Sequence, residues 1–523
     1  MELVTAAEMR DLDRAAITEL KISSFRLMEQ AGKAVVRAME RRFDPLRGKT
    51  VTIVVGKGQN GGDGLVVARL LRKKGCTAQV ALLFPPSAIT GDAAVNLKRL
   101  QQGGNRSKIV TYAADFDTTL RALFQRSDVL VDAIFGTGLN APVTGRAWRV
   151  ITLMNDFGRP IIAIDLPSGL DSDNGSVLGT AITAALTVTM TRPKRGLYLG
   201  VGPNHAGLIR VADIGIPDAL VAAAKIPVTL LQAGDIRPLL PQRPRTAHKG
   251  TCGHAGVIAG SPGKTGAAAM TAMAALRSGA GLVTVAAPRG ICDILEAKLL
   301  EAMVVPVPET DQRAFSTKAL PALLAFAADK TALAVGPGIG TDPDTQTLVH
   351  RLLVKTTRPM VLDADGLNAI AGHRDLLNRA SSPLILTPHP GEMARLLETT
   401  SAEIQRDRLG AASRLAHGHN VYVVLKGAGT IIAAPDGRLA VNSTGNPGMA
   451  TAGAGDVLTG LIAGLLAQGL APWDAACAGA FLHGLAGDLA VTEQGEAGMI
   501  AGDIIQSIPR AIQRILSHST TTT

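Results

Sequence analysis

Aromatic residues are scarce in this sequence of 523 residues, where Phe, Trp and Tyr together make up only 3%. Proteins that bind single-stranded nucleic acid commonly stack bases on aromatic side chains, so this scarcity disfavours such a function. The core must be built from Ala, Val, Leu and Ile, because hydrophobic residues in total reach 46%. With 18% charged residues and 57 glycines, the composition favours a globular α/β protein with many tight turns over a disordered chain.

Cysteines are few, and no long apolar run is present. The four cysteines lie far apart and form no CxxC pair, so neither a zinc site nor a disulfide framework is predicted. No uninterrupted apolar stretch reaches about 18 residues, the length typical of a membrane span. The N-terminal segment is amphipathic and partly acidic, unlike a secretory signal. We therefore expect a cytoplasmic protein without a membrane partner.

Runs of like charge are missing as well, although the formal net charge is +10. Because the 53 Lys and Arg residues are scattered along the chain, no nucleic-acid surface is predicted. Anionic small molecules such as nucleotides account for the positive excess equally well, and so does plain solubility.

The length of the chain exceeds what one hydrophobic core can organise, so two or more domains are expected. Residues before Lys49 predict two helices, and apolar strands are predicted in both halves, at 51–56, 78–84, 128–136, 160–169, 255–261 and 281–287, with further strands within 331–340, 358–370, 382–393 and 421–432. A Pro-, Arg- and Gly-rich segment at 239–253 is a plausible connection between domains.

Strands that are apolar on both faces and alternate with helices predict parallel sheets covered on two sides. We therefore predict an α/β protein with a Rossmann-like doubly wound sheet at 1–217 and a second α/β domain at 228–516. No internal repeat relates the two halves. The last residues, 517–523, are expected to be frayed.

The most distinctive segment of the first half is GKGQNGGDG at 56–64, between a predicted strand and a predicted helix. Glycines let the backbone approach a ligand closely, and free amides at a helix start face negative charge. The spacing also matches the dinucleotide pattern GxGxxG, but Asn60 and Asp63 add side-chain oxygens. On its own the segment is about equally typical of a tight turn that binds nothing.

Two further strand ends carry polar residues, Asp132 in VDAIFGTGLNAP and Asp165 with Ser168 in IDLPSGLD. Ligands of doubly wound sheets bind at the carboxyl ends of strands, where all three segments end. Asn60, Asp132 and Ser168 could supply oxygen ligands for an alkali cation, which leaves Asp165 for acid–base chemistry. Each aspartate alone is typical of a cap or turn, and the coincidence of three strand ends favours chemistry.

Together with TRPKRGLYLG (191–200), these segments resemble the NAD(P)H-hydrate epimerase domain over about residues 1–215. The resemblance implies that potassium is bound by Asn60, Asp132 and Ser168, and that Asp165 acts in catalysis. It also implies contacts with the hydrated nucleotide for Asp165 and for Gln59, Asn60, Gly61, Gly62, Asp63, Gly136, Thr137, Gly138, Leu139, Asn140, Ala141 and Pro142. Gln59 departs from the commoner NNGGD motif of the family but retains a side-chain amide.

The second half carries a glycine-rich loop, GNPGMATAGAGD (445–456), before a helix of small and apolar residues. Such a loop directs several backbone amides to one point, which suits a transferring phosphoryl group. Asp456 at the helix start can accept a proton from a substrate hydroxyl that attacks phosphorus. The alternative is a glycine hinge with Asp456 as an ordinary N-cap, but GAGD is more specific than a generic GxG.

Two strand ends upstream of this loop add candidate residues. LKGAGT (425–430) places Lys426 and backbone amides near a phosphate, and TPHPGEMARL (387–396) directs His389 and Glu392 to the same edge. Taken singly, Lys426 is as typical of a solvated loop and His389 of a turn, and their shared placement at strand ends favours function. SPGKTG contains GKT but lacks the upstream glycine of a P-loop, so no P-loop is predicted.

GAGD at a helix start resembles the ribokinase-like superfamily. The ordered set HKGTCGHAGVIAGS, GPGIG, DADGLNAI, TPHPGEMARL and GNPGMATAGAGDVLTG resembles, more narrowly, the ADP- or ATP-dependent NAD(P)H-hydrate dehydratase domain, over about residues 230–515. The resemblance implies hydrate contacts at Ala255, Gly338, His389, Pro390, Gly391, Glu392, Met393, Ala394, Arg395 and Asp456. Adenine nucleotide would contact Lys426, Gly427, Ala428, Gly429, Thr430, Asn446, Pro447, Gly448, Met449, Ala450, Thr451, Ala452, Gly453, Ala454 and Gly455.

The two resemblances imply successive steps on one small-molecule substrate, epimerisation of R and S hydrates followed by dehydration of the S form. In the second step Asp456 would deprotonate the C6 hydroxyl, and Mg²⁺ would bridge the phosphates of ADP or ATP. A vitamin-precursor kinase is disfavoured by HPGEMARL and the fused first half, and a binder without turnover by the carboxylates Asp165 and Asp456. Alanine-rich helices at 266–279 and 457–469 could pack against partners, and we expect a homo-oligomer.

Overall fold

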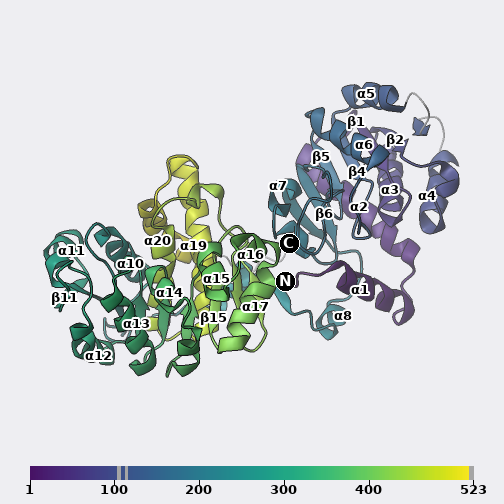
Figure 1. Cartoon of the computed structure of the whole chain (residues 1–523). Helices are drawn as coiled ribbons and strands as arrows, with labels where there is room; N and C mark the ends of the chain where they lie inside the picture. Colours follow the sequence, from purple (N-terminus) through teal and green to yellow (C-terminus); the bar gives the residue numbers. More distant parts are fainter. Residues whose placement is uncertain (103–107, 112–115, 518–523) are drawn as a thin grey trace. The chain divides into compact units, whose positions relative to one another are not determined.

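The computed structural model describes residues 1–102, 108–111 and 116–517, and the chain divides into two compact units, Met1–Ile226 and Pro227–Thr523 (Figure 1). The segment 239–253, predicted as the connection between domains, lies inside the second unit, so that prediction was wrong. The reason is that β8 (Val228–Leu230), upstream of this segment, already pairs with β17 (Leu439–Val441) of the second sheet. Residues 518–523, most of the end expected to be frayed, lie outside the described part.

The sheet of the first unit is parallel throughout, with the order β3-β2-β1-β4-β5-β6-β7. The strands are β1 (Thr50–Val55), β2 (Thr77–Leu82), β3 (Ile109–Thr111), β4 (Val129–Ala133), β5 (Ile161–Ile164), β6 (Leu186–Met190) and β7 (Leu208–Ala212). The order reverses at β1, because β2 and β4 lie on its two sides. In sheets of this kind the crevice at the carboxyl ends of such strands binds ligands.

The helices of this unit are α1 (Ala6–Thr18), α2 (Ser24–Phe43), α3 (Gln59–Lys73), α4 (Gly91–Gln102), α5 (Phe116–Arg126), α6 (Gly145–Asp156), α7 (Gly202–Ala206) and α8 (Asp218–Ala223). Residues 59–64 of the predicted turn 56–64 already form the first part of α3. A Cβ at Gly61 would overlap the carbonyl oxygen of Gly56, and one at Gly64 would overlap the side chain of Ala133. These two glycines therefore let α3 lie directly on β1 and β4.

The sheet of the second unit has the order β11-β10-β9-β12-β13-β14-β15-β16-β17-β8. Its strands besides β8 and β17 are β9 (His254–Ile258), β10 (Leu282–Pro288), β11 (Met303–Val307), β12 (Ala332–Val335), β13 (Met360–Leu362), β14 (Leu384–Leu386), β15 (Tyr422–Leu425) and β16 (Ile431–Ala433). Pairing is parallel from β11 to β15 and antiparallel on both sides of β16. The carboxyl ends of β12 to β15 therefore meet at one edge.

The helices of the second unit are α9 (Ala233–Ile236), α10 (Thr265–Arg277), α11 (Cys292–Lys298), α12 (Leu320–Ala328), α13 (Pro343–Lys355), α14 (Asp365–Ile370), α15 (Pro390–Leu397), α16 (Ser401–Arg406), α17 (Arg408–His419), α18 (Ala454–Ala467), α19 (Pro472–Gln494) and α20 (Ala501–Ser517). The predicted α/β class is thus confirmed for both units, since each has a mainly parallel sheet with helices between its strands.

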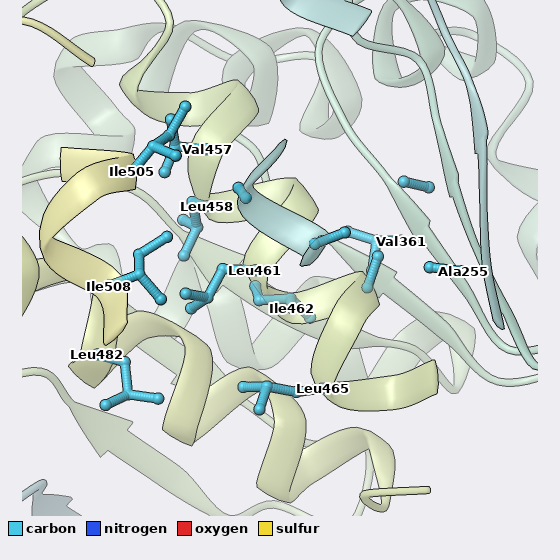
Figure 2. Close-up of a cluster of buried hydrophobic side chains, with 14 of the residues drawn as sticks. Ala255, Val361, Val457, Leu458, Leu461, Ile462, Leu465, Leu482, Ile505 and Ile508 are labelled. Carbon is cyan, nitrogen blue, oxygen red and sulfur yellow. The ribbon is translucent and has the colours of Figure 1, made fainter. Parts of the chain in front are cut away.

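Helix α18 is the centre of the second core. Figure 2 shows Leu461 of α18 among Ile508 of α20, Leu482 of α19 and Val361 of β13, all members of one buried apolar cluster. Each such side chain stabilises the fold by roughly 1.5–3 kcal/mol relative to an exposed position. A Cβ at Gly460 would overlap the backbone of Thr271, so this glycine lets α10 approach α18 closely. The alanine-rich helices therefore pack on each other within the unit, and their composition does not indicate an oligomer interface.

Among the described residues, α19 alone is long and apolar enough to cross a membrane by the criteria of length and composition. Its apolar stretch is 72% buried inside the protein, and it packs against α18 and α20. A buried core helix of a globular domain meets the same criteria, so α19 is weak support for a membrane span.

Candidate active sites

A cavity of about 590 Å³ opens at the carboxyl ends of β1 and β4, where the strand order of the first sheet reverses. This volume lies within the range of about 300–1,000 Å³ that is usual for small-molecule sites. Of the predicted contact residues, the cavity is lined by Gln59, Asn60, Asp63, Gly136, Thr137, Gly138, Leu139, Asn140 and Asp165.

Four predicted contact residues lie elsewhere. Gly61 and Gly62 are buried in α3 and serve helix packing, since a Cβ on Gly62 would overlap the side chain of Met28. Ala141 and Pro142 follow the lining loop and are not part of the cavity wall as formed by the described residues.

The three predicted cation ligands converge at the wall of the cavity, around the backbone of Phe135. Asn60 Nδ2 donates to the carbonyl oxygen of Phe135 at 2.8 Å, and the Phe135 amide donates to Ser168 Oγ at 2.8 Å. Ser168 also donates its hydroxyl to Asp132 Oδ1 at 2.6 Å and its amide to Asp132 Oδ2 at 2.7 Å. Burial raises the pKa of Asp132 to about 6, although the hydrogen bonds from Ser168 oppose the shift.

One acceptor in this group is unsatisfied. Asn60 Oδ1 is buried and has no hydrogen-bond partner among the described residues. A buried carbonyl oxygen without a partner normally costs about 1–3 kcal/mol. An alkali cation would supply the missing contact and would neutralise the buried Asp132 carboxylate, so the donor set fits a potassium ion.

Asp165 enters the cavity from an unusual backbone position directly after β5. Its φ is +66°, in the left-handed region that non-glycine residues rarely occupy. The carboxylate accepts the ammonium of Lys194, whose side chain is only 1% exposed. Lys194 donates as well to Thr189 Oγ1 and the Met190 carbonyl, both at 3.1 Å, so its three N–H groups all have partners. The lysine therefore fixes the position of the Asp165 carboxylate.

Two more carboxylates line this cavity. Burial raises the pKa of Asp13 to about 6, while Lys194 lowers it and Asp165 raises it further. Burial raises the pKa of Asp63 well above its usual value, and the negative charges of Asp165 and Asp13 add to that shift. The cavity therefore combines a lysine-bound carboxylate with two carboxyl groups that retain protons more readily than exposed ones.

The second candidate site lies at the start of α18. Gly453, the N-cap of this helix, has a φ of +90°, which glycine tolerates best, and Asp456 is the third residue of the helix rather than its cap. Amides in the first turn of a helix lack intrahelical partners, so those of Gly455 and Asp456 are available to an anion. The carbonyl of Asp456 accepts Thr271 Oγ1 of α10 at 3.2 Å, which holds the helix start in place.

Lys426, which follows β15, brings together carboxylates that follow two other strands, β13 and β14. Its ammonium lies 2.7 Å from Asp363 Oδ1 and 3.7 Å from Glu392 Oε2. Burial lowers the pKa of Lys426, but Asp363, Glu392 and Asp456 outweigh burial and raise it overall. The side chain is 19% exposed, so the alternative of a solvated loop lysine is wrong. A Cβ on Gly455 would lie 3.3 Å from Lys426 Nζ, which places the ammonium beside the glycine loop.

The same cluster sets the proton affinity of Asp456. Burial raises the pKa of Asp456 to about 7; Asp363 adds to the shift, Lys426 opposes it, and Asp365 and Glu392 add smaller increments. A carboxylate with a pKa near neutrality is suited to take up and release protons under physiological conditions.

His389 caps α15. Its Nδ1 accepts the amides of Gly391 at 2.9 Å and Glu392 at 3.3 Å, and Glu392 Oε2 accepts the His389 amide at 2.7 Å. His389 Nε2 lies 3.5 Å from Glu392 Oε1 on a half-exposed ring. The capping function thus uses Nδ1, whereas Nε2 lies beside the Glu392 carboxylate. Arg395 donates to Asn368 at 3.0 Å, while Met393 and Ala394 are buried.

The predicted nucleotide loops are held by side chains from other elements. Arg408 of α17 is buried and donates to the carbonyls of Leu425 and Lys426 at 3.2 Å and to that of Ala428, which fixes the loop 426–430. Asp488 of α19 accepts the Gly445 amide and Asn446 Nδ2, both at 3.0 Å, which fixes the start of 446–455.

The two remaining predicted hydrate contacts differ in their positions. Gly338, after β12, has a φ of +64°, and its carbonyl accepts Ser261 Oγ at 2.7 Å. Ala255 is the second residue of β9, fully buried in the apolar cluster (Figure 2). Its side chain therefore faces the core rather than the carboxyl edge of the sheet.

Several residues of the two candidate sites were not predicted from the sequence. Asp363 is fully buried and accepts both Lys426 and, at 2.7 Å, Thr459 Oγ1, while Asp365 accepts Lys264 and the Gly340 amide at 2.9 Å. The signal for both was present, since two aspartates directly follow the buried strand RPMVL. Asp13 and Lys194 had weaker signals: one lies in an amphipathic helix and the other in a basic loop.

Taken together, the folds and sites define a two-domain α/β enzyme, with a cavity lined by carboxylates in one unit and a glycine loop beside a cluster of lysine and carboxylates in the other. Family models support both halves: the model for NAD(P)H-hydrate dehydratase matches residues 255–510, and that for YjeF-related protein N-terminus matches residues 24–196. The chain belongs to the family of bifunctional NAD(P)H-hydrate repair enzymes, as whole-chain similarity to curated members shows. The family resemblance drawn from the sequence is thereby confirmed.

The relatives match nearly end to end. The chain is 48% identical to bifunctional NAD(P)H-hydrate repair enzyme Nnr of Moorella thermoacetica over 98% of this chain and 97% of that one. Its identity to the enzyme of the same name from Escherichia coli is 34%, over 97% and 93% of the two chains.

Two solved structures are similar to part of the chain. ADP/ATP-dependent NAD(P)H-hydrate dehydratase from Bacillus subtilis, co-crystallised with ATP and Mg²⁺, is 31% identical with a TM-score of 0.48, covering 55% of this chain and 99% of that chain. A ribokinase-like superfamily protein from Enterococcus faecalis is 28% identical with a TM-score of 0.49, covering 56% and 97%.

Proposed function

We propose that this protein repairs hydrated NADH and NADPH. Its first unit interconverts the R and S hydrates, and its second unit dehydrates the S hydrate at the expense of ADP or ATP, releasing phosphate and AMP or ADP. The observation that carries this proposal is the position of Asp456, whose pKa is raised to about 7 by burial, beside the amides that open α18 and the ammonium of Lys426. Family membership supports the substrate.

In the dehydration, Asp456 accepts the proton of the C6 hydroxyl, and the hydroxyl oxygen attacks the terminal phosphorus of the nucleotide. First-turn amides of α18 stabilise charge on the transferring phosphoryl group, and Lys426 holds the cluster of carboxylates in position. The ring nitrogen then supplies its electron pair, the C6–O bond breaks and phosphate leaves, which forms a C6=N1 iminium. Loss of a proton from C5 then forms the C5=C6 double bond and returns the electron pair to the nitrogen. NADH or NADPH results, and the nucleotide has lost one phosphoryl group.

Magnesium fits this site as a companion of the nucleotide. No cluster of three or more His, Cys, Asp or Glu side chains suited to hold a metal ion by itself occurs in the described part of the chain. Magnesium commonly binds through one or two carboxylates together with substrate phosphates, and Asp363 and Glu392 are the carboxylates nearest Lys426. When bound, the ion would neutralise phosphate charge.

In the epimerisation, Asp165 exchanges a proton with the C6 hydroxyl of the hydrate in the 590 Å³ cavity. Potassium would be held by Asn60, Asp132 and Ser168, and the unsatisfied Asn60 Oδ1 supports this assignment. The ion would order the loop after β4 through the ligands that surround Phe135. A cytoplasmic location suits these soluble nucleotide substrates, and the homo-oligomer stays a prediction.

A single assay separates this function from its two rivals. The full chain is incubated with a mixture of R and S hydrates of NADH, ADP and Mg²⁺, and reduced nicotinamide absorbance and inorganic phosphate are followed. We expect complete conversion to NADH with stoichiometric phosphate, because both epimers are consumed. A stable phosphorylated product would identify a kinase, and no turnover would identify a binding protein; either result would reject the proposal.

The potassium site gives a second expectation. Asp132→Asn removes one negative charge from the ligand set with little change of shape, so the apparent affinity for K⁺ in epimerisation should fall by about 10- to 100-fold. Saturating K⁺ should restore the rate, and dehydration of pure S hydrate by the same chain should be unaffected. Asp128→Asn is the matched control, because exposed Asp128 lies just before β4 at its amino end. Equal K⁺ dependence in wild type and Asp132→Asn would refute the assignment.

A further inference from the structure

Helix α1 contributes a carboxylate that the mechanism above does not use. Met9, Asp13 and Ile17 all line the cavity and are spaced four residues apart, so they form one face of the helix. Asp13 is thus directed into the cavity between two apolar side chains. It lies outside residues 24–196, the part of the first unit that the family model matches.

The position of α1 is fixed by the segment that carries Lys194. Val4 forms a parallel bridge with Lys194, with its amide donating to the Pro193 carbonyl at 3.0 Å and its carbonyl accepting the Arg195 amide at 3.0 Å. Glu8 of α1 accepts Arg195 at 2.8 Å. The loop that positions Lys194, and through it Asp165, therefore also positions Asp13.

The surroundings of Asp13 leave its carboxyl group available to a ligand. No described residue forms a hydrogen bond or ion pair with it, and the three N–H groups of Lys194 are used by Asp165, Thr189 and Met190. The other charged groups of the cavity wall are Asp63 of α3, Lys57 before it and Arg10 of α1. On α8, which packs against α1, Asp218 is paired with Arg192.

The environment of Asp13 favours the protonated form of its carboxyl group. Burial raises the pKa of Asp13 to about 6, against the opposing charge of Lys194. A carboxyl group with this pKa is protonated in about one molecule in ten at pH 7, whereas an ordinary aspartate, with a pKa of about 3.9, is protonated in about one in a thousand.

We propose that Asp13 is the second proton-transfer residue of the epimerase site, acting on the ring nitrogen of the hydrate while Asp165 acts on the C6 hydroxyl. This inference rests on the proposed function. Two carboxyl groups held by one loop on the wall of one cavity can serve two atoms of the same ring, as acid–base catalysis of ring opening requires.

Ring opening and ring closure both conserve protons and electrons. Asp165 takes the proton of the C6 hydroxyl, the oxygen electrons form the C6=O double bond, and the C6–N1 bond breaks. The electron pair of that bond stays on N1, which takes the proton of Asp13. The open aldehyde turns its other face toward N1, and the reverse transfers close the ring as the opposite epimer. Both carboxyl groups regain their initial protonation, and no co-reactant is consumed.

Asp13→Asn in the full chain tests the proposal. Because Asn cannot deliver a proton, we expect kcat for epimerisation to fall by about a hundredfold. Dehydration of pure S hydrate by the same preparation should be unchanged and reports that the second unit is folded. Asp11→Asn is the matched control, since Asp11 lies on the same helix in an exposed pair with Arg14. Its epimerisation rate should equal that of wild type.

The pH profile distinguishes proton transfer from a structural role. The wild-type epimerisation rate should decline above about pH 6, because a general acid is lost as pH rises through its pKa. Asp13→Asn should abolish this decline, and Asp13→Glu should restore both the decline and part of kcat. An Asp13→Asn rate and profile equal to wild type would overturn the inference while leaving the proposed function intact. Absence of epimerisation by the wild-type chain would instead refute the proposed function of the first unit.

Discussion

Asp456→Asn is expected to lower kcat for dehydration of the S hydrate by about 10²- to 10⁴-fold, the usual contribution of a general base. Asn keeps the volume of the side chain and the amides of α18, so binding of the nucleotide should change little. The loss should therefore be seen in kcat with a nearly constant KM for ADP. Phosphate release and NADH absorbance from the pure S hydrate measure it directly.

The pH dependence of the same reaction gives an independent test. Asp456 accepts a proton only when ionised, so the wild-type rate should fall as pH drops below about 7, the raised pKa of this group. The rate of the Asp456→Asn variant should not show this fall at low pH, the acid limb of the profile. Asp474→Asn is a suitable control, because Asp474 lies in the first turn of α19 in the same unit and outside the site. A variant at Asp456 that retains both the rate and the limb would exclude its role as the base.

Local sequence signals were sufficient to locate the strand ends at which the two candidate sites lie. GKGQNGGDG, IDLPSGLD and GAGD each couple a buried strand or helix start to polar residues, and parallel pairing brings such ends to one edge. Because glycines usually mark turns, the sequence predicts that the helix after β1 begins beyond Gly64, whereas α3 begins at Gln59. Here Gly61 and Gly64 serve close contact between the helix and the sheet, a tertiary requirement that propensity does not contain.

Long-range partners were beyond the sequence for a physical reason. Asp363 and Lys426 are 63 residues apart, and their pairing depends on the adjacency of β13, β14 and β15 rather than on local pattern. Asp13 looks like a surface charge on an amphipathic helix until the bridge between Val4 and Lys194 turns that face toward the cavity. Ala255 is the opposite case: its sequence motif predicts a contact with the substrate, but its side chain packs in the hydrophobic core.

Lys426→Met is expected to destabilise the second unit by about 3 kcal/mol, because removing one partner of a buried ion pair leaves its charge uncompensated. The residue left behind is Asp363, whose side chain is 1% exposed and would retain only its hydrogen bond from Thr459. Urea unfolding measures this loss. In a Trp148→Phe background, Trp473 is the only tryptophan of the chain and lies in the second unit, so its fluorescence reports on that unit.

The same substitution should also shift the chemistry in a defined direction. Lys426 opposes the rise in the pKa of Asp456, so removing the ammonium should raise that pKa further and move the acid limb of dehydration to higher pH. Lys298→Met is the control, since Lys298 is exposed on α11 and its loss should change stability by less than about 0.5 kcal/mol. If Lys426→Met unfolded at the wild-type urea concentration and kept the limb in place, the ammonium would have neither function. A shifted limb with normal stability would show that the carboxylates, relieved of their partner, take up protons instead of destabilising the fold.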